Sequence, residues 1–265
     1  AYAKTMIPLD LGNYGGGVTI STADSQGPTP ADPTAPPVGV RRVTGATLSG
    51  SPDLDPWRSD NFDLALEYYY GPATMFNIAA FRLNIEIIVT RATVPQSGSY
   101  ADGDGVIRRL VDVNRPVQGD GGQLQGIEIG AKIGLSDFID TPIWSDFGFD
   151  GSYTFSDSSS NSTALNGDEL PFQDNSKHSL NAAVWYQGDK LQARVAWNYR
   201  TPRLNSTFGS IPIYQDTSQY VDVNVTYDVN DMVTVYANGS NVLGEIEEYY
   251  LEFKPGAEQF QSRNE

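Results

Sequence analysis

The stretch Lys190-Leu-Gln-Ala-Arg-Val-Ala-Trp-Asn-Tyr-Arg200 alternates apolar and polar residues. Successive side chains of a β-strand point to opposite sides of a sheet, so strict alternation places one face in an apolar medium and the other in water. The stretch therefore predicts an amphipathic strand. Its apolar face carries Leu191, Ala193, Val195, Trp197 and Tyr199, and its polar face carries Gln192, Arg194, Ala196, Asn198 and Arg200.

The same period-two pattern recurs along the chain, most clearly over residues 62–70 and 221–228. Segments of about ten residues with alternating polarity, separated by turn residues, are typical of transmembrane β-barrels. The expected fold is all-β, an antiparallel up-and-down transmembrane β-barrel. We predict strands over residues 1–8, 57–70, 74–90, 122–136, 146–157, 177–188, 190–203, 218–229 and 232–244.

The connections between these strands alternate in length. Four are short, over residues 71–73, 136–145, 188–189 and 229–231, and they carry Gly, Pro, Asn or Asp. The others, over residues 9–56, 91–121, 158–176, 204–217 and from 245 onward, are long and rich in the same residues. Outer-membrane barrels have short periplasmic turns and long extracellular loops. The alternation therefore favours a membrane barrel over a soluble sandwich.

Aromatic residues gather beside three of the short connections. Tyrosine and tryptophan collect at membrane boundaries because their rings are apolar and their tips are polar. We therefore predict a periplasmic ring of aromatic side chains formed by Tyr68, Tyr69, Tyr70, Trp185, Tyr186 and Tyr227.

Composition excludes several classes of protein. A net charge of -16 argues against nucleic acid as a partner, because binding phosphates needs a basic surface. The sequence holds no apolar run long enough for a membrane-spanning helix. With no cysteine and a single histidine, His178, it lacks a convergent set for catalysis or for a metal site. We expect no catalytic residue, no cofactor and no bound metal, and we interpret Asp102-Gly-Asp-Gly105 as an extracellular loop rather than a calcium loop.

Several segments resemble a known family. Gly50-Ser-Pro-Asp-Leu-Asp-Pro56, which leads into the strand ending at Tyr70, is similar to a Gly-Asn-Pro-x-Leu-x-Pro segment of TonB-dependent outer-membrane receptors. Further segments resemble that family in the same order: Tyr2-Ala-Lys-Thr-Met6, Asp102-Gly-Asp-Gly105 to Gly119-Asp-Gly-Gly122, Gly126-Ile-Glu-Ile129, Lys177-His-Ser179, and Val221-Asp-Val to Tyr236-Ala-Asn-Gly-Ser-Asn-Val-Leu243.

This resemblance implies part of a barrel of about 22 strands. It implies residence in the outer membrane of a Gram-negative bacterium, and import of a scarce nutrient such as a siderophore, a vitamin or a saccharide. The partners would be outer-membrane lipid, the nutrient, a plug domain and the TonB energy-coupling protein. We expect residues 1–265 to be the C-terminal part of the barrel domain, about nine strands long, with the plug domain and the closing strand absent from this chain.

Candidate functional residues follow from this interpretation. The polar faces of two strands predict side chains that line a water-filled lumen, namely Gln192, Arg194, Asn198, Arg200, Asp222 and Asn224. Aromatic residues of the long loops are candidates for contact with the nutrient, namely Tyr14, Tyr100, Phe208 and Tyr214. Two alternatives stay open: a soluble secreted β-sandwich or adhesin-like surface protein, whose apolar faces meet across a dry core, and a smaller outer-membrane porin.

Overall fold

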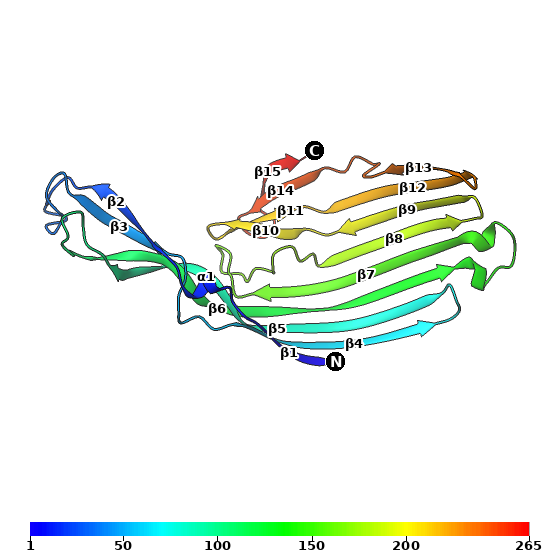
Figure 1. Cartoon of the computed structure of the whole chain (residues 1–265), viewed down its shortest axis with the longest axis horizontal. Helices are drawn as coiled ribbons and strands as arrows, with labels where there is room; N and C mark the ends of the chain where they lie inside the picture. The colour runs from blue at the N-terminus through cyan, green and yellow to red at the C-terminus, as the bar shows by residue number, and fades with distance from the viewer. Residues whose placement is uncertain (265) are drawn as a thin grey trace. The chain divides into compact units, whose positions relative to one another are not determined.

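The structure is a computed structural model and describes residues 1–264, leaving aside the side chains of residues 120, 261 and 264. Its largest sheet follows the order β1-β4-β5-β6-β7-β8-β9-β12-β13 (Figure 1). These strands are β1 (Tyr2–Ile7), β4 (Trp57–Tyr69), β5 (Met75–Ser99), β6 (Leu110–Gly134), β7 (Phe147–Ser160), β8 (His178–Gln187), β9 (Leu191–Arg200), β12 (Ser218–Asn230) and β13 (Val233–Gly239).

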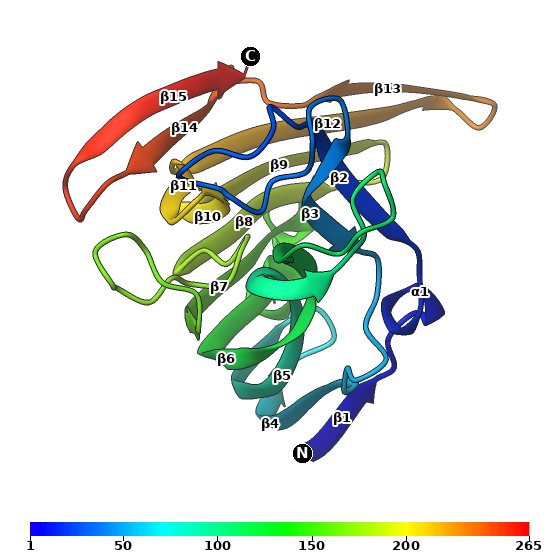
Figure 2. The same ribbon diagram turned by 90° about the vertical axis from the view of Figure 1, so that its left-hand side faces the viewer.

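All nine predicted strands are present, and each pairs with its sequence neighbours among the nine. The pairings from β6 through β7, β8, β9 and β12 to β13 are all antiparallel. The four short connections lie together at one end of the strands, at the right of Figure 1. We call the series β4 to β9 with β12 and β13 the wall; Figure 2 shows these strands following one another in that order. The predicted up-and-down order and the alternation of connection lengths are confirmed.

The predicted long loops contain more structure than the sequence suggested. The loop predicted over 91–121 is wrong, because β5 continues to Ser99 and β6 begins at Leu110. The connection from β1 to β4 holds the four-residue helix α1 (Leu11–Tyr14), β2 (Val18–Asp24) and β3 (Arg41–Leu48). A second sheet, in the order β10-β11-β14-β15, consists of β10 (Arg203–Phe208), β11 (Ile211–Gln215), β14 (Glu247–Glu252) and β15 (Glu258–Asn264).

The chain divides into two compact units. Unit 1 comprises Ala1–Ala3, Asp60–Asn84 and Gly122–Glu265, and unit 2 comprises Lys4–Ser59 and Ile85–Gly121. Unit 2 holds a small apolar core that includes Val43, Ala46 and Val113, beside the parallel contact of β3 with β6. Among residues 1–264, no helix is long and apolar enough to cross a membrane.

One face of the wall is apolar and exposed. Val184, Val195 and Val223 lie side by side on β8, β9 and β12, and the side chains of Val184 and Val195 are 53% and 47% exposed. A soluble sandwich would bury such residues against a second sheet, because exposed apolar area costs about 25 cal/mol per Å². In the described part of the chain this face has no such cover. This exposure disfavours the sandwich alternative and fits a face that meets lipid.

Close approach of side chains to glycine backbone shapes the other face. A Cβ on Gly148 would stand 2.0 Å from the nearest atom of the Trp185 ring, so this ring lies directly against the glycine backbone. Trp185 is opposite Arg194 in the pairing of β8 with β9, so it belongs to the polar face, whereas its neighbour Tyr186 belongs to the apolar face. The prediction that Trp185 belongs to the same periplasmic ring of aromatic side chains as Tyr186 is wrong, because consecutive residues of a strand point to opposite sides.

Candidate functional site: a polar groove on the inner face of the wall

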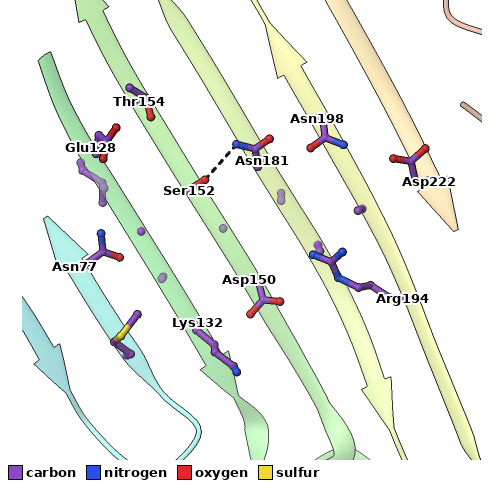
Figure 3. Close-up of a pocket in the computed structure, with 18 of the residues that line it drawn as sticks. Asn77, Glu128, Lys132, Asp150, Ser152, Thr154, Asn181, Arg194, Asn198 and Asp222 are labelled. Carbon is purple, nitrogen blue, oxygen red and sulfur yellow. Dashed lines mark hydrogen bonds between the residues drawn. The ribbon is translucent and has the colours of Figure 1, made fainter. Parts of the chain in front are cut away.

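The polar sides of six wall strands, β5 to β9 and β12, line one groove. Cross-strand pairing aligns Glu128 with Thr154, and Ser152 with Asn181, which in turn faces Asn198. The groove has a volume of about 590 Å³, and Figure 3 shows its polar side chains rising from neighbouring strands. Besides these residues it is lined by Asn77, Lys132, Asp150, Arg194, Asp222 and Asn224 among others.

Hydrogen bonds hold several polar groups of the groove. The Asn181 amide donates to Ser152 over 3.3 Å, and the Asn224 amide donates to the Asn238 side chain over 3.0 Å. The Asp222 carboxylate accepts from the backbone N–H of Asn241 over 2.9 Å. These bonds fix the orientation of the polar side chains without closing the groove.

The charged groups of the groove are less completely paired. Within residues 1–264, Glu128, Lys132 and Arg194 form no ion pair at salt-bridge distance. Their charges remain available to a partner that enters from the open side. Because charges at a water-filled surface attract complementary groups, the groove suits a polar, charged partner better than an apolar one.

Most predicted lumen residues lie together on this face. Arg194, Asn198, Asp222 and Asn224 line the groove, and Gln192 lines an adjoining hollow of about 360 Å³. Arg200 lies on the same face at the end of β9, where its guanidinium donates to the Asp174 carbonyl over 2.7 Å. That these six residues line a lumen stays a prediction.

The other half of the groove consists of residues that the sequence did not predict. Asn77, Glu128, Lys132, Asp150, Ser152, Thr154 and Asn181 belong to β5, β6, β7 and β8. The signal was present in the alternation of Gly126-Ile-Glu-Ile-Gly-Ala-Lys132, whose even-numbered positions share one face of β6. What the sequence lacked was the register that aligns those positions with Asn198 and Asp222.

The four loop aromatics are distributed over both units. Tyr14 ends α1 and Tyr100 follows β5, both in unit 2 and both half-buried. In unit 1, Phe208 ends β10 and is 72% exposed, whereas Tyr214 on β11 stacks on Tyr250 with ring centroids 5.7 Å apart. Burial raises the pKa of both stacked tyrosines. Their role in contacting a nutrient stays a prediction.

The Asp102–Gly105 loop is held by arginine. Asp102 accepts from the backbone N–H of Val43 over 2.8 Å and from Arg108 over 3.1 Å, and its side chain is 3% exposed. Asp104 pairs with both terminal nitrogens of Arg108, at 2.8 and 2.6 Å. This guanidinium lowers the pKa of Asp104 to about 2. Guanidinium groups thus occupy the carboxylates that a calcium ion would need.

Comparison with known proteins adds to this geometry. A family model described as "TonB dependent receptor-like, beta-barrel" matches residues 7–242. The iron-regulated outer membrane virulence protein of Vibrio cholerae serotype O1 (El Tor Inaba N16961) is 25% identical over 216 residues, 79% of this chain and 30% of that protein. The classical Ogawa form is 24% identical over 212 residues, with the same coverage. The chain thus spans about 30% of the length of these relatives.

Two solved structures share the fold. A mutant ferric enterobactin receptor of Pseudomonas aeruginosa, in complex with enterobactin, has a TM-score of 0.62 at 15% identity, covering 91% of this chain and 32% of its own. The siderophore receptor PirA of Acinetobacter baumannii has a TM-score of 0.58 at 15% identity, covering 94% and 33%. At this identity the likeness extends to the fold alone.

Proposed function

Because this chain belongs to the TonB-dependent receptor family, we propose that it forms part of the barrel wall and the extracellular loops of a receptor that imports a ferric siderophore. The family lies in the outer membrane of Gram-negative bacteria, and its members are transporters rather than enzymes. Import would depend on TonB, which supplies the work, and on a plug domain, which occupies the lumen.

The polar groove carries this proposal. A lumen plugged by a folded domain needs a wall that offers hydrogen bonds and charges without sealing permanently to that domain. Lys132, Arg194 and Glu128 provide charges of both signs, open to a partner. We propose that side chains of the plug pair with them in the resting receptor, and that these contacts break when the plug moves. The wall itself stays a rigid support.

The siderophore class is supported by the relatives. One is an iron-regulated outer membrane protein, and two solved structures of the same fold are described as receptors for siderophores. We propose that Tyr14, Tyr100, Phe208 and Tyr214 contribute aromatic surface to the nutrient contact on the extracellular side. Planar aromatic or delocalised groups of an iron chelate would stack on such rings.

Uptake of radioactive iron tests the proposal. Cells that lack the full-length receptor should lose import of one class of ferric siderophore, and cells that lack TonB should lose it equally. Import restored by the receptor without TonB would contradict the coupling, and unchanged import of every siderophore tested, together with lost uptake of cobalamin or a saccharide, would contradict the substrate.

A paired substitution tests the role of the groove. Arg194→Glu should reduce iron uptake while leaving the amount of receptor at the cell surface unchanged, because the side chain lies in an open groove. The matched control is Val195→Ile, one residue along β9 on the opposite face. Equal uptake by the two variants would contradict a role of the groove in transport.

A further inference from the structure

The connection between β6 and β7 exposes four large apolar side chains at the short-turn end of the wall. Phe138 is 52% exposed, Ile143 62% and Trp144 59%, and Ile139 is 37% exposed. This connection, which contains the 3₁₀ turns η1 (Leu135–Asp137) and η2 (Trp144–Asp146), is the longest of the four short ones. Apolar side chains clustered on one exposed segment mark contact with lipid or with another protein.

Aromatic contacts join this connection to the apolar face of the wall. Phe138 stacks on Tyr70 with ring centroids 4.9 Å apart. The ring centroids of Trp144 and Phe147 are 5.8 Å apart, and those of Phe147 and Tyr186 are 4.9 Å apart. The last two belong to the face that meets lipid in a barrel of this family. The exposed cluster is therefore continuous with an existing lipid interface.

The polar and strained groups of the connection fit the same arrangement. The Asp137 carboxylate turns toward the neighbouring connection, where it accepts from the backbone N–H of Ala73 over 3.1 Å. Ile143 has φ 75° and ψ −50°, close to the γ-turn conformation that is rare and strained. Glycine adopts a positive φ without strain, so isoleucine at this position marks a strained backbone whose cost the surroundings must offset.

The length of the apolar face on β7 supplies a third argument. Its outward residues run from Phe147 to Phe155, and the next outward side chain, Asp157, pairs with Lys177 at 3.4 Å. At about 3.3 Å per residue and a tilt of about 40°, eight residue steps cover about 20 Å of membrane. The apolar band of an outer-membrane barrel is about 25 Å tall. About 5 Å must come from beyond Phe147, toward the short connection.

We propose that residues 138–144 insert into the headgroup boundary of the periplasmic leaflet and anchor the short-turn end of the wall in the membrane. The inserted side chains complete the apolar band, and burial of Ile143 in the boundary offsets the strain of its backbone. The occupant of this surface is lipid, not a periplasmic protein. The inference rests on the barrel fold and is independent of which solute the receptor imports.

A spin label at residue 143 tests this proposal. The chain has no cysteine, so Ile143→Cys gives residues 1–265 one attachment point, and any cysteine elsewhere in the full-length receptor is first replaced by serine. In the full-length receptor reconstituted in vesicles of phosphatidylethanolamine and phosphatidylglycerol, collisions of the label with oxygen and with a water-soluble nickel chelate report its depth. Val195→Cys serves as the lipid control and Asn161→Cys, in the long connection after β7, as the water control.

The expected result is a ratio of oxygen to nickel collisions between the two controls or equal to the lipid control. A ratio equal to that of Asn161→Cys would overturn the proposal and leave the surface to a protein partner. Ile139→Cys repeats the measurement should Ile143→Cys fail to fold, which the shift of the folded band on an unheated gel reveals. Failure of iron uptake in any of these variants would concern the import proposal and not the depth of the label.

Discussion

Val195→Arg places a charge at the centre of the apolar face of β9. Val195 lies four residues from Leu191 and four from Tyr199, the two ends of the outward run on this strand. At about 2.5 Å of membrane depth per tilted residue, both ends are about 10 Å away. The cross-strand neighbours are Val184 and Val223, which offer the guanidinium no acceptor.

The expected cost follows from this depth. An arginine on the lipid face near the midplane destabilises a membrane barrel by about 2 to 4 kcal/mol. Since about 1.4 kcal/mol corresponds to a factor of ten, the equilibrium ratio of folded to unfolded protein should fall roughly 30- to 1,000-fold. A charge placed near Leu191 or Tyr199 should cost less, because the side chain reaches the headgroups.

Unfolding by guanidinium chloride in lipid vesicles measures this effect on the full-length protein. The matched control is Gln192→Arg, on the opposite face of the same strand, where the new side chain enters a hollow of about 360 Å³ that also contains Asp150. We expect the control to lose less than about 0.5 kcal/mol, as surface substitutions do. Equal destabilisation by both variants would refute the assignment of lipid to one face and water to the other.

Three further predictions concern single sites. Asp102→Ala removes one partner of a buried ion pair and should lower the free energy of local unfolding of residues 100–109 by about 3 kcal/mol. Proteolysis of this segment should therefore be faster, whereas exposed Asp53→Ala should leave the cleavage rate unchanged. Arg108 lowers the pKa of Asp104 from 3.8 to about 2, so this pairing stabilises the loop above about pH 4 and the stabilisation is lost as the pH falls from about 4 to about 2. Arg108→Gln lacks the pairing at every pH, so pepsin should cleave the loop of this variant faster than that of the unchanged protein at pH 4, and the difference should shrink as the pH approaches 2. Gly126→Ala should destabilise the wall by about 1 to 3 kcal/mol in chemical unfolding, because its Cβ would stand 2.1 Å from the Phe155 carbonyl oxygen, and Gly130→Ala should cost less because it meets only the mobile end of Asn77.

The strands of the wall could be predicted from sequence because two solvents act on them. Lipid on one side and water on the other impose a period of two on every strand, and that period is legible without any knowledge of neighbours. The strands outside the wall lack this signal. β11 is five residues long and contains Pro212, which removes a backbone donor and argues against a strand in the middle of a sheet. The extensions of β5 and β6 contain Pro95 and Pro116, and these prolines likewise argue against a strand when only the sequence is considered.

The groove could be predicted only in part. Alternation assigns Arg194 and Asp222 to one face, but it does not reveal which residues of β6 and β7 lie beside them. That depends on register, which is set by the lengths of the connections and by packing between strands. Trp185 and Tyr186 illustrate the limit. Adjacent aromatic residues must separate to opposite faces, and only the pairing of Trp185 with Arg194 decides which ring faces the groove.

The ion pairs of Asp102 and Asp104 bear on how the receptor tolerates its surroundings. Divalent cations bridge the acidic headgroups of a bacterial surface, and chelating agents that strip them weaken it. A loop folded around calcium would come apart under the same treatment. Here arginine, a cation bonded into the chain and never lost to a chelator, balances those carboxylates. This part of the surface should therefore keep its shape when the magnesium and calcium around it are removed.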